Sequence, residues 1–140
     1  SEEHLNALLK LADWRLAFKL WRQAFDTYKE IWDVLAATDP VRLNQVFGQP
    51  TPLFDVRPGT PKRMFESIRE NRTQRGEAEY GYSISRKGEV EDLITLRKNP
   101  EDFDTYGHRR ALGKMRFRPA FVDGEPVKSW DRRRIIRFLY

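Results

Sequence analysis

The fold is decided between residues 75 and 118, which read RGEAEYGYSISRKGEVEDLITLRKNPEDFDTYGHRRALGKMRFR. Apolar and polar side chains alternate on both sides of Lys87-Gly88. Alternation with period two is what a strand with one buried face requires, and Gly88 can adopt the positive φ of a tight turn. The stretch therefore predicts a β-hairpin with the apolar side chains Ala78, Tyr80, Tyr82, Ile84, Val90, Leu93, Ile94 and Leu96.

A helix and further strands are predicted after this hairpin. Pro100 ends the second strand, and the acidic residues Glu101 and Asp102 suit the N-terminus of a helix that runs to about Met115. Asp123-Gly124 then predicts a two-residue turn between apolar segments. The last strand is predicted from about Arg132 to Phe138.

The N-terminal part predicts a helical hairpin over residues 3–38. Apolar residues recur there at spacings of three and four, and the connection is expected near Phe18-Lys19-Leu20. Asp39-Pro40 is expected to stop the second helix. The residues with this spacing are Leu5, Leu8, Leu9, Ala12 and Leu16 in the first helix and Phe25, Tyr28, Trp32 and Leu35 in the second.

Residues 41–60 are rich in proline and glycine, which argues against a helix or a central strand and predicts an irregular linker. The linker is too apolar for a free tether, and we expect it to be held on a neighbouring surface by Val46, Phe47, Leu53 and Phe54. A short helix is predicted from Lys62 to about Asn71.

Composition limits the function classes. The chain has no Cys, which removes disulfides, thiol catalysis and zinc-thiolate sites, and its two His residues have no metal-binding spacing. The carboxylate pairs Glu89/Glu91 and Glu101/Asp102 are explained by solvent exposure and helix N-terminal charge. We predict a structural role for His108, at the border of the core. The sequence thus predicts no enzyme, no catalytic residues, no cofactor and no metal site.

Charge is unevenly distributed along the chain. Residues 1–60 carry seven Lys or Arg against eight Asp or Glu, whereas residues 61–140 carry nineteen against thirteen. The basic half is compatible with an anionic partner or with a solvated surface whose Arg stems cover apolar area. Acidic residues are interleaved throughout, which favours the second interpretation.

Five positions of the helical hairpin carry large and small residues in a recurring order: Leu11, Ala12, Trp21, Ala24 and Tyr28. This segment resembles one tetratricopeptide repeat, with Arg15 where an aromatic residue is usual and Lys19 where a small residue is usual. Such repeats stack, and at least three are normally needed for stability. We therefore expect the hairpin to be the end of an array, and the chain, which starts with Ser, to be a piece of a longer protein.

Several segments of residues 61–140 occur in a specific order: Pro61-Lys62-Arg63-Met64, Arg75-Gly76-Glu77-Ala78, Lys87-Gly88-Glu89-Val90, Arg109-Arg110-Ala111-Leu112 through Met115-Arg116-Phe117-Arg118-Pro119-Ala120, and Asp123-Gly124-Glu125-Pro126-Val127. In this order the region resembles the C-terminal periplasmic domain of TonB-type energy transducers. The resemblance implies an α+β fold in which a short helix, a β-hairpin, a helix and strands form a small antiparallel sheet backed by helix. The expected organisation is a helical hairpin over 1–40, a linker over 41–60 and this domain over 61–140.

The same resemblance implies a periplasmic adaptor that binds a protein or peptide, such as a segment of an outer-membrane receptor, in energy-dependent transport across the outer membrane. No small-molecule substrate is expected, and membrane association would require an upstream anchor. TonB-type domains accept a peptide at the edge of the final strand. The resemblance carries this role to Arg132, Arg134, Ile135, Ile136 and Phe138. The three arginines at 132–134 are equally compatible with charge that protects an edge from aggregation.

Two alternatives remain open at this point. In one, the helical hairpin is the interaction scaffold, with Trp14, Trp21, Tyr28 and Trp32 lining a concave surface, and the sheet domain is a structural cap. In the other, which the modest net charge disfavours, Arg109, Arg110, Lys114, Arg116 and Arg118 bind nucleic acid beside Phe117.

Overall fold

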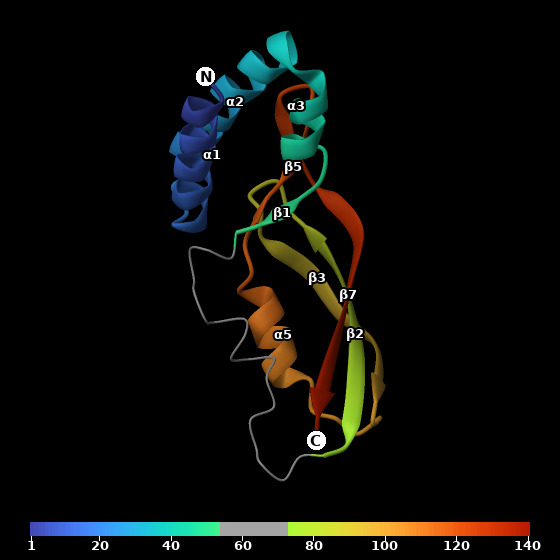
Figure 1. The fold of residues 1–140 in the computed structure, drawn as a ribbon. Coiled ribbons are helices and arrows are strands. Elements are labelled where there is room, and N and C mark those ends of the chain that lie inside the picture. Colours follow the sequence, from blue (N-terminus) through green and yellow to red (C-terminus); the bar gives the residue numbers. More distant parts are fainter. Residues whose placement is uncertain (54–72) are drawn as a thin grey trace.

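The computed structural model describes residues 1–53 and 73–140, which form a mixed α+β fold. Helices gather at the N-terminal end of an elongated molecule, and a long antiparallel sheet extends from them to the C-terminus (Figure 1). This confirms the predicted α+β class with N-terminal helices. Phe54 and the helix predicted over residues 62–71 lie outside the described residues.

Helices α1 (Glu2–Ala17) and α2 (Trp21–Thr38) form the predicted hairpin. The connection lies where we expect it, and Lys19 there has a φ of 64°. Ser1 caps α1 by accepting a hydrogen bond from the backbone N–H of His4. The two helices are joined across the core because the Tyr28 hydroxyl donates to the Asp13 carboxylate at 2.5 Å.

The prediction of an irregular linker is wrong for residues 41–47, because α3 (Pro40–Phe47) is a helix. Pro40 stops α2 and also stands at the first position of α3, where its missing N–H costs nothing. Asp39 accepts a hydrogen bond from the Arg42 backbone N–H and so caps α3. The expectation that the linker is held by its apolar residues is confirmed for Val46, Phe47 and Leu53, which are buried.

Strands β2 (Arg75–Ile84), β3 (Val90–Asn99) and β7 (Ser129–Leu139) form an antiparallel sheet in the order β3-β2-β7. The hairpin predicted around Lys87-Gly88 is confirmed, and Gly88 has a φ of 79°. The single buried face predicted for the second strand is wrong at Ile94 and Leu96, which are 54% and 40% exposed. The reason is that two register shifts in the β2–β3 pairing move these side chains to the outer face.

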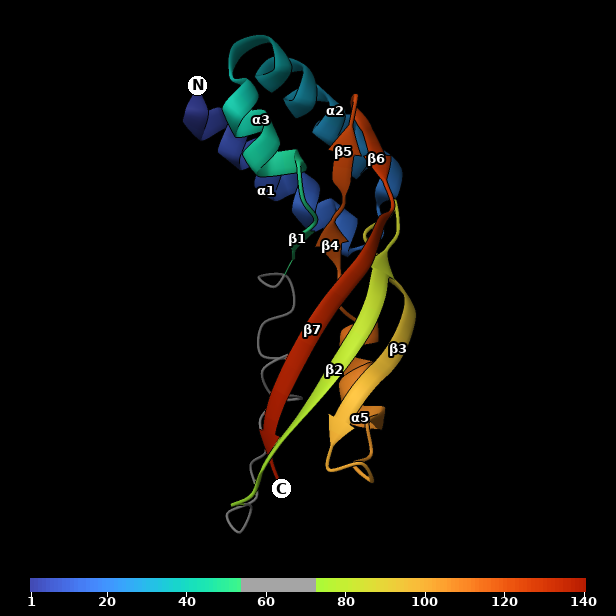
Figure 2. The same cartoon turned by 90° about the vertical axis from the view of Figure 1, so that its right-hand side faces the viewer.

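Helix α5 (Tyr106–Gly113) covers the inner face of the sheet, as the two views together show (Figures 1 and 2). It is shorter than the predicted helix, which was expected to start near Glu101. The Phe103 N–H donates to the Pro100 carbonyl in a turn, and Asp104 accepts from the Tyr106 N–H at the true start of the helix. The inner-face core comprises Ala78, Tyr80, Ile84, Leu112, Met115, Phe117, Ile136 and Phe138.

A second core lies among the three N-terminal helices and takes one residue from far along the chain. Strands β5 (Ala120–Val122) and β6 (Glu125–Val127) form the hairpin predicted at Asp123-Gly124. Phe121 of β5 is 5% exposed and contacts Tyr28, Trp32 and Phe47 at ring-centroid distances of 5.5, 6.4 and 4.8 Å. Strand β1 (Thr51–Pro52) pairs with β4 (Phe117–Arg118) below this core. The C-terminal strands therefore complete the N-terminal helical core.

Candidate peptide-binding edge

Strand β7 is one edge of the three-stranded sheet, and no described residue pairs with its outer side. It pairs with β2 through eight consecutive residues without a register shift, from Arg75 opposite Leu139 to Tyr82 opposite Arg132. A bulge precedes this regular part, where Asp131 has a φ of 55°. The result is a long, regular strand edge that runs along one side of the sheet (Figure 2).

The direction of the backbone groups on β7 follows from one residue pair. Gln74 and Tyr140 exchange both backbone hydrogen bonds, at 3.0 and 2.7 Å. In an antiparallel ladder such pairs alternate with pairs whose N–H and C=O groups point away from each other. Even-numbered residues of β7 therefore bond to β2. The free edge is formed by the backbone groups of Arg133, Ile135, Arg137 and Leu139.

The inner face of β7 is fixed by packing. Ile136 and Phe138 are 5% and 6% exposed, and the Phe138 ring stacks on Phe103 with the centroids 3.9 Å apart. The Phe138 ring also lies 5.3 Å from the ring of His108. Arg134 donates a hydrogen bond to the Met115 sulfur at 3.3 Å. These contacts hold the strand against α5, and no described strand pairs with its outer side.

A buried polar pair supports the same region from behind. The Tyr80 hydroxyl lies 2.8 Å from Nδ1 of His108, which is 6% exposed. Burial raises the pKa of Tyr80 to about 12 and lowers the pKa of His108. Both groups are therefore neutral at neutral pH. The expectation that His108 borders the core is confirmed.

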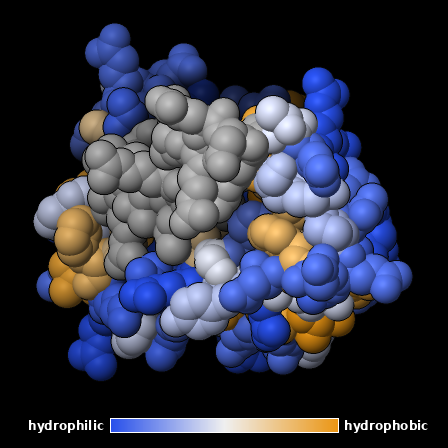
Figure 3. Space-filling view, turned by 90° about the horizontal axis from the view of Figure 1, so that it is seen from below, coloured by the Kyte–Doolittle hydropathy of each residue, from blue (hydrophilic) through white to orange (hydrophobic). Residues whose placement is uncertain are grey.

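The outer face of the sheet has a shallow hollow beside this edge. Gly81 is one of its lining residues, and a Cβ atom at that position would lie 3.3 Å from the Leu96 side chain. Trp130, which is 65% exposed, and Arg133 line the other side of the hollow. Seen from the C-terminal end of the molecule, hydrophobic residues occupy small areas separated by hydrophilic ones (Figure 3).

The opposite edge of the sheet, on β3, is less suited to pairing. Its ladder to β2 is broken by two register shifts, and Asp92 has a φ of 55°. Arg109 of α5 donates a hydrogen bond to the Leu93 carbonyl at 3.4 Å. Bulges and covering side chains are common protections of sheet edges. Of the two edges, β7 is the one with a regular free backbone.

All five residues predicted at a peptide-binding edge lie on β7. Their backbone N–H and C=O groups, however, do not all point to the same side of the strand. Ile135 has its backbone groups on the free edge, whereas Arg132, Arg134, Ile136 and Phe138 bond to β2. Three residues outside the predicted set also have their backbone groups on the free edge: Arg133, Arg137 and Leu139. The sequence carries no signal for this parity, because it depends on which residues of two distant strands face each other.

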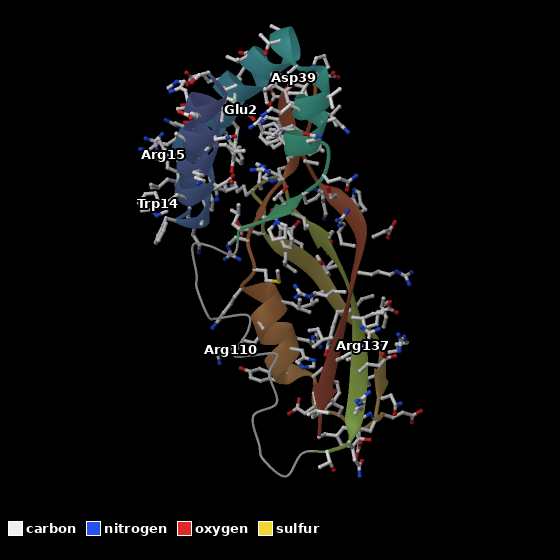
Figure 4. All side chains as sticks on the ribbon, viewed as in Figure 1. Glu2, Trp14, Arg15, Asp39, Arg110 and Arg137 are labelled. Carbon is white, nitrogen blue, oxygen red and sulfur yellow. The ribbon has the colours of Figure 1, made fainter. Side chains whose placement is uncertain are left out.

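The four aromatic residues of the alternative helical surface do not form one exposed site. Tyr28 is fully buried, and Trp32 packs on Phe47 with the ring centroids 5.6 Å apart. The Lys87 ammonium lies 4.1 Å from the ring centre of Trp21. Trp14 is 51% exposed and points outward from α1 (Figure 4).

The basic residues of the nucleic-acid alternative do not lie together on one exposed surface either. Phe117 and Arg118 are 5% and 6% exposed, so neither lies on an open surface. Arg116 donates hydrogen bonds to the carbonyls of Gly113 and Met115. Arg109 and Arg110 are both on α5, and Arg110 lies on the other side of the molecule from Arg137 (Figure 4).

The described part of the chain offers little support for a metal site or a membrane span. No group of three His, Asp or Glu residues there could hold a metal ion. None of the helices described combines the length and the hydropathy needed to cross a membrane. The strand edge is therefore the feature with the clearest binding chemistry.

Comparison with known proteins adds no assignment. No protein-family model matches the chain, and no curated protein matches it.

Proposed function

We propose that this protein is a non-catalytic adaptor of the bacterial cell envelope, of the TonB C-terminal type, which binds a partner peptide by strand addition at β7. The observation that carries the proposal is the free edge of β7, where Arg133, Ile135, Arg137 and Leu139 offer their backbone groups in unbroken register. The sequence resemblance over residues 61–140 supports the same role. In this proposal the domain is periplasmic, and its partner is an extended protein segment, such as one from an outer-membrane receptor, in energy-dependent transport.

Backbone pairing alone would give weak binding. About six new hydrogen bonds at roughly 1 kcal/mol net each supply about 6 kcal/mol. Association costs roughly 4–15 kcal/mol in lost freedom. Side-chain contacts along the added strand must therefore supply much of the affinity, or the partner must be tethered nearby.

The proposal is tested by NMR titration of the ¹⁵N-labelled chain with short extended peptides at millimolar concentration. We expect amide shifts confined to residues 131–140 and the adjacent part of β2, with cross-strand NOEs from the peptide to β7. Peptides of varied charge, including a neutral Thr/Val peptide, are used so that the test does not depend on one sequence. Absence of shifts on β7 with every peptide would contradict the proposal.

A pair of variants tests the edge itself. The Ile135 N–H points to the free edge, so Ile135→Pro removes a donor from that edge without removing one from the β2–β7 ladder. We expect this variant to keep the sheet and to lose peptide binding, whereas Ile135→Val keeps both. A folded Ile135→Pro protein that binds peptide with unchanged affinity would place the binding elsewhere.

A second candidate function is favoured by an exposed apolar row on α1. Leu11, Trp14 and Phe18 are 39%, 51% and 54% exposed, and the rings of Trp14 and Phe18 lie 4.8 Å apart. Such a row suits a tetratricopeptide-type scaffold that binds another protein, with the sheet as a structural cap. Trp14→Ala should then remove a partner captured by the intact chain. An unchanged set of partners would dismiss this alternative.

A further inference from the structure

The free edge of β7 and the outer face of the sheet share the same residues. Arg133, Ile135 and Arg137 turn their backbone groups to the free edge, and all three side chains are exposed on the face opposite α5. A strand added to this edge must place every second side chain on that outer face, beside this row. The row therefore determines which side chains the partner can carry at alternate positions.

The row has the pattern basic, apolar, basic. The Arg133 side chain makes no hydrogen bond or ion pair with another described residue. Arg137 is 76% exposed, and its carboxylate neighbour Glu77 lies 3.7 Å away. That carboxylate is already engaged by Arg97 at 2.6 Å. Between the two arginines, Ile135 is 39% exposed.

Acidic residues near the row are few and lie to its sides. Glu77 and Glu79 on β2 both contact Arg97 of β3, which compensates one of their two negative charges, and Glu77 is also shared with Arg137. Asp131 stands at the bulge before the regular part of β7. The strip that an incoming strand would contact therefore carries one exposed guanidinium at each end, and the one on Arg133 has no carboxylate partner among the described residues.

Building on the proposed function, we infer that the partner is an extended acidic peptide with the pattern acid-x-apolar-x-acid. Its two carboxylates lie beside Arg133 and Arg137, and its central apolar side chain packs on Ile135. The pattern is symmetric, so it holds whether the peptide runs parallel or antiparallel to β7. Neutral side chains at the two outer positions leave Arg133 without a carboxylate and Arg137 with only the carboxylate of Glu77, which Arg97 also engages.

Binding of three seven-residue peptides to the full chain tests this inference, with affinities from NMR shifts at low salt. The first peptide, acetyl-TETVTET-amide, has one glutamate two residues before the valine and one two residues after it, and the second peptide has glutamine in their place. The third, acetyl-TTEVETT-amide, has the same composition with the acids moved by one residue, so that they flank the valine on the opposite face. We expect the first to bind about two- to thirty-fold more tightly than either control, the range for two cross-strand charge pairs. Raising the salt concentration should reduce this difference.

Charge reversal supplies the matched variants. With Arg133→Glu we expect the glutamate peptide to lose its advantage, because it then meets one guanidinium and one carboxylate, and the corresponding lysine peptide to bind this variant more tightly than it binds the wild type. Arg110→Glu changes the net charge equally but lies on the other side of the molecule (Figure 4), and it should leave the order of the peptides unchanged. The gain of the lysine peptide shows that the Arg133→Glu protein is folded and competent.

The outcomes separate the two ideas. Equal affinity for the glutamate and glutamine peptides, with shifts on β7 in both cases, would overturn the acidic pattern and leave strand addition standing. A tighter third peptide would also overturn it. Binding of no peptide at β7 would overturn both.

Discussion

At the residue scale, two buried polar side chains beneath the sheet are partners of each other. Tyr80 and His108 pair beneath the sheet, and the His108 ring also contacts Phe103 and Phe138. Because these neighbours are apolar rings, burial lowers the pKa of His108. The histidine thus lowers stability in acid, since the folded state disfavours its protonated form.

We predict that His108 makes stability depend on pH. The folded protein binds its proton less tightly than the unfolded chain, so the free energy of unfolding is unaffected above about pH 6.5 and falls as the pH decreases below it. Urea unfolding at pH 7.5 and 5.5 should show a larger loss for the wild type than for His108→Gln. Gln cannot titrate but can still bond to Tyr80. His4→Gln, at an exposed position, should behave like the wild type, and equal losses in all three proteins would refute the assignment.

At the scale of elements, two turns depend on glycine for different reasons. Gly88 and Gly124 both have a φ of 79°. A Cβ at Gly88 would lie 1.8 Å from the Phe117 carbonyl oxygen, whereas one at Gly124 would lie 3.5 Å from the Trp32 ring. Gly88 thus lies in direct contact with the segment that leads from α5 into β4, and the Phe117 N–H donates to the Gly88 carbonyl at 2.9 Å.

The two alanine substitutions are therefore a matched pair. Gly124→Ala should lower the free energy of unfolding by about 1–2 kcal/mol, the cost of positive φ alone. Gly88→Ala adds a backbone clash and should cost about 3 kcal/mol or more. Urea denaturation measures both. Similar values for the two variants would mean that the contact with Phe117 relaxes without cost.

Sequence periodicity and turn residues were sufficient to predict the helices, turns and strands that depend on residues close together in the chain. The helical hairpin, the turn at Lys87-Gly88, the turn at Asp123-Gly124 and the last strand were all predicted from spacing and turn residues. Helix α3 was missed because Pro40 and the later prolines look like helix breakers, although Pro40 occupies the one helical turn that tolerates it. The outward direction of Ile94 and Leu96 was missed because one buried face was assumed for all apolar residues of the strand, although the adjacent Leu93 and Ile94 interrupt the alternation where the register shifts.

The candidate edge was predictable as a strand but not as a set of contacts. Alternation and terminal position were enough to expect a strand over Arg132 to Phe138. Which of its residues face the free edge depends on register with β2, about fifty residues earlier in the chain. This is why Arg133 and Arg137, central to the inferred acidic partner, were not predicted.

At the scale of the whole molecule, one arginine joins the two cores. Arg118 is 6% exposed, and it donates hydrogen bonds to Asp13 Oδ2 at 2.9 Å, the Val46 carbonyl at 3.1 Å and Thr51 Oγ1 at 3.2 Å. Burial raises the pKa of Asp13, while Arg118 acts in the opposite direction. Phe121, three residues later, fills the helical core. Strands β4 and β5 therefore attach the segment that follows α5 to the N-terminal helices.

We predict that Arg118→Met destabilises both regions. It leaves Asp13 without its cation, and loss of one partner of a buried pair costs about 3–5 kcal/mol. Amide exchange should accelerate in α1 and also in β2. Arg110→Met on the exposed part of α5 should change stability by less than about 0.5 kcal/mol. Faster exchange confined to the helices would show that the two cores unfold independently.

The antiparallel register between β2 and β7, which is unbroken from Arg75 to Tyr82, has a mechanical consequence. A pull applied along β7 and resisted at β2 loads all of their shared backbone hydrogen bonds at once, in shear, so the strands cannot unzip one bond after another. Tension on a peptide lying along this strand would be distributed in the same way. The sheet is built to withstand traction along its length better than peeling at its end.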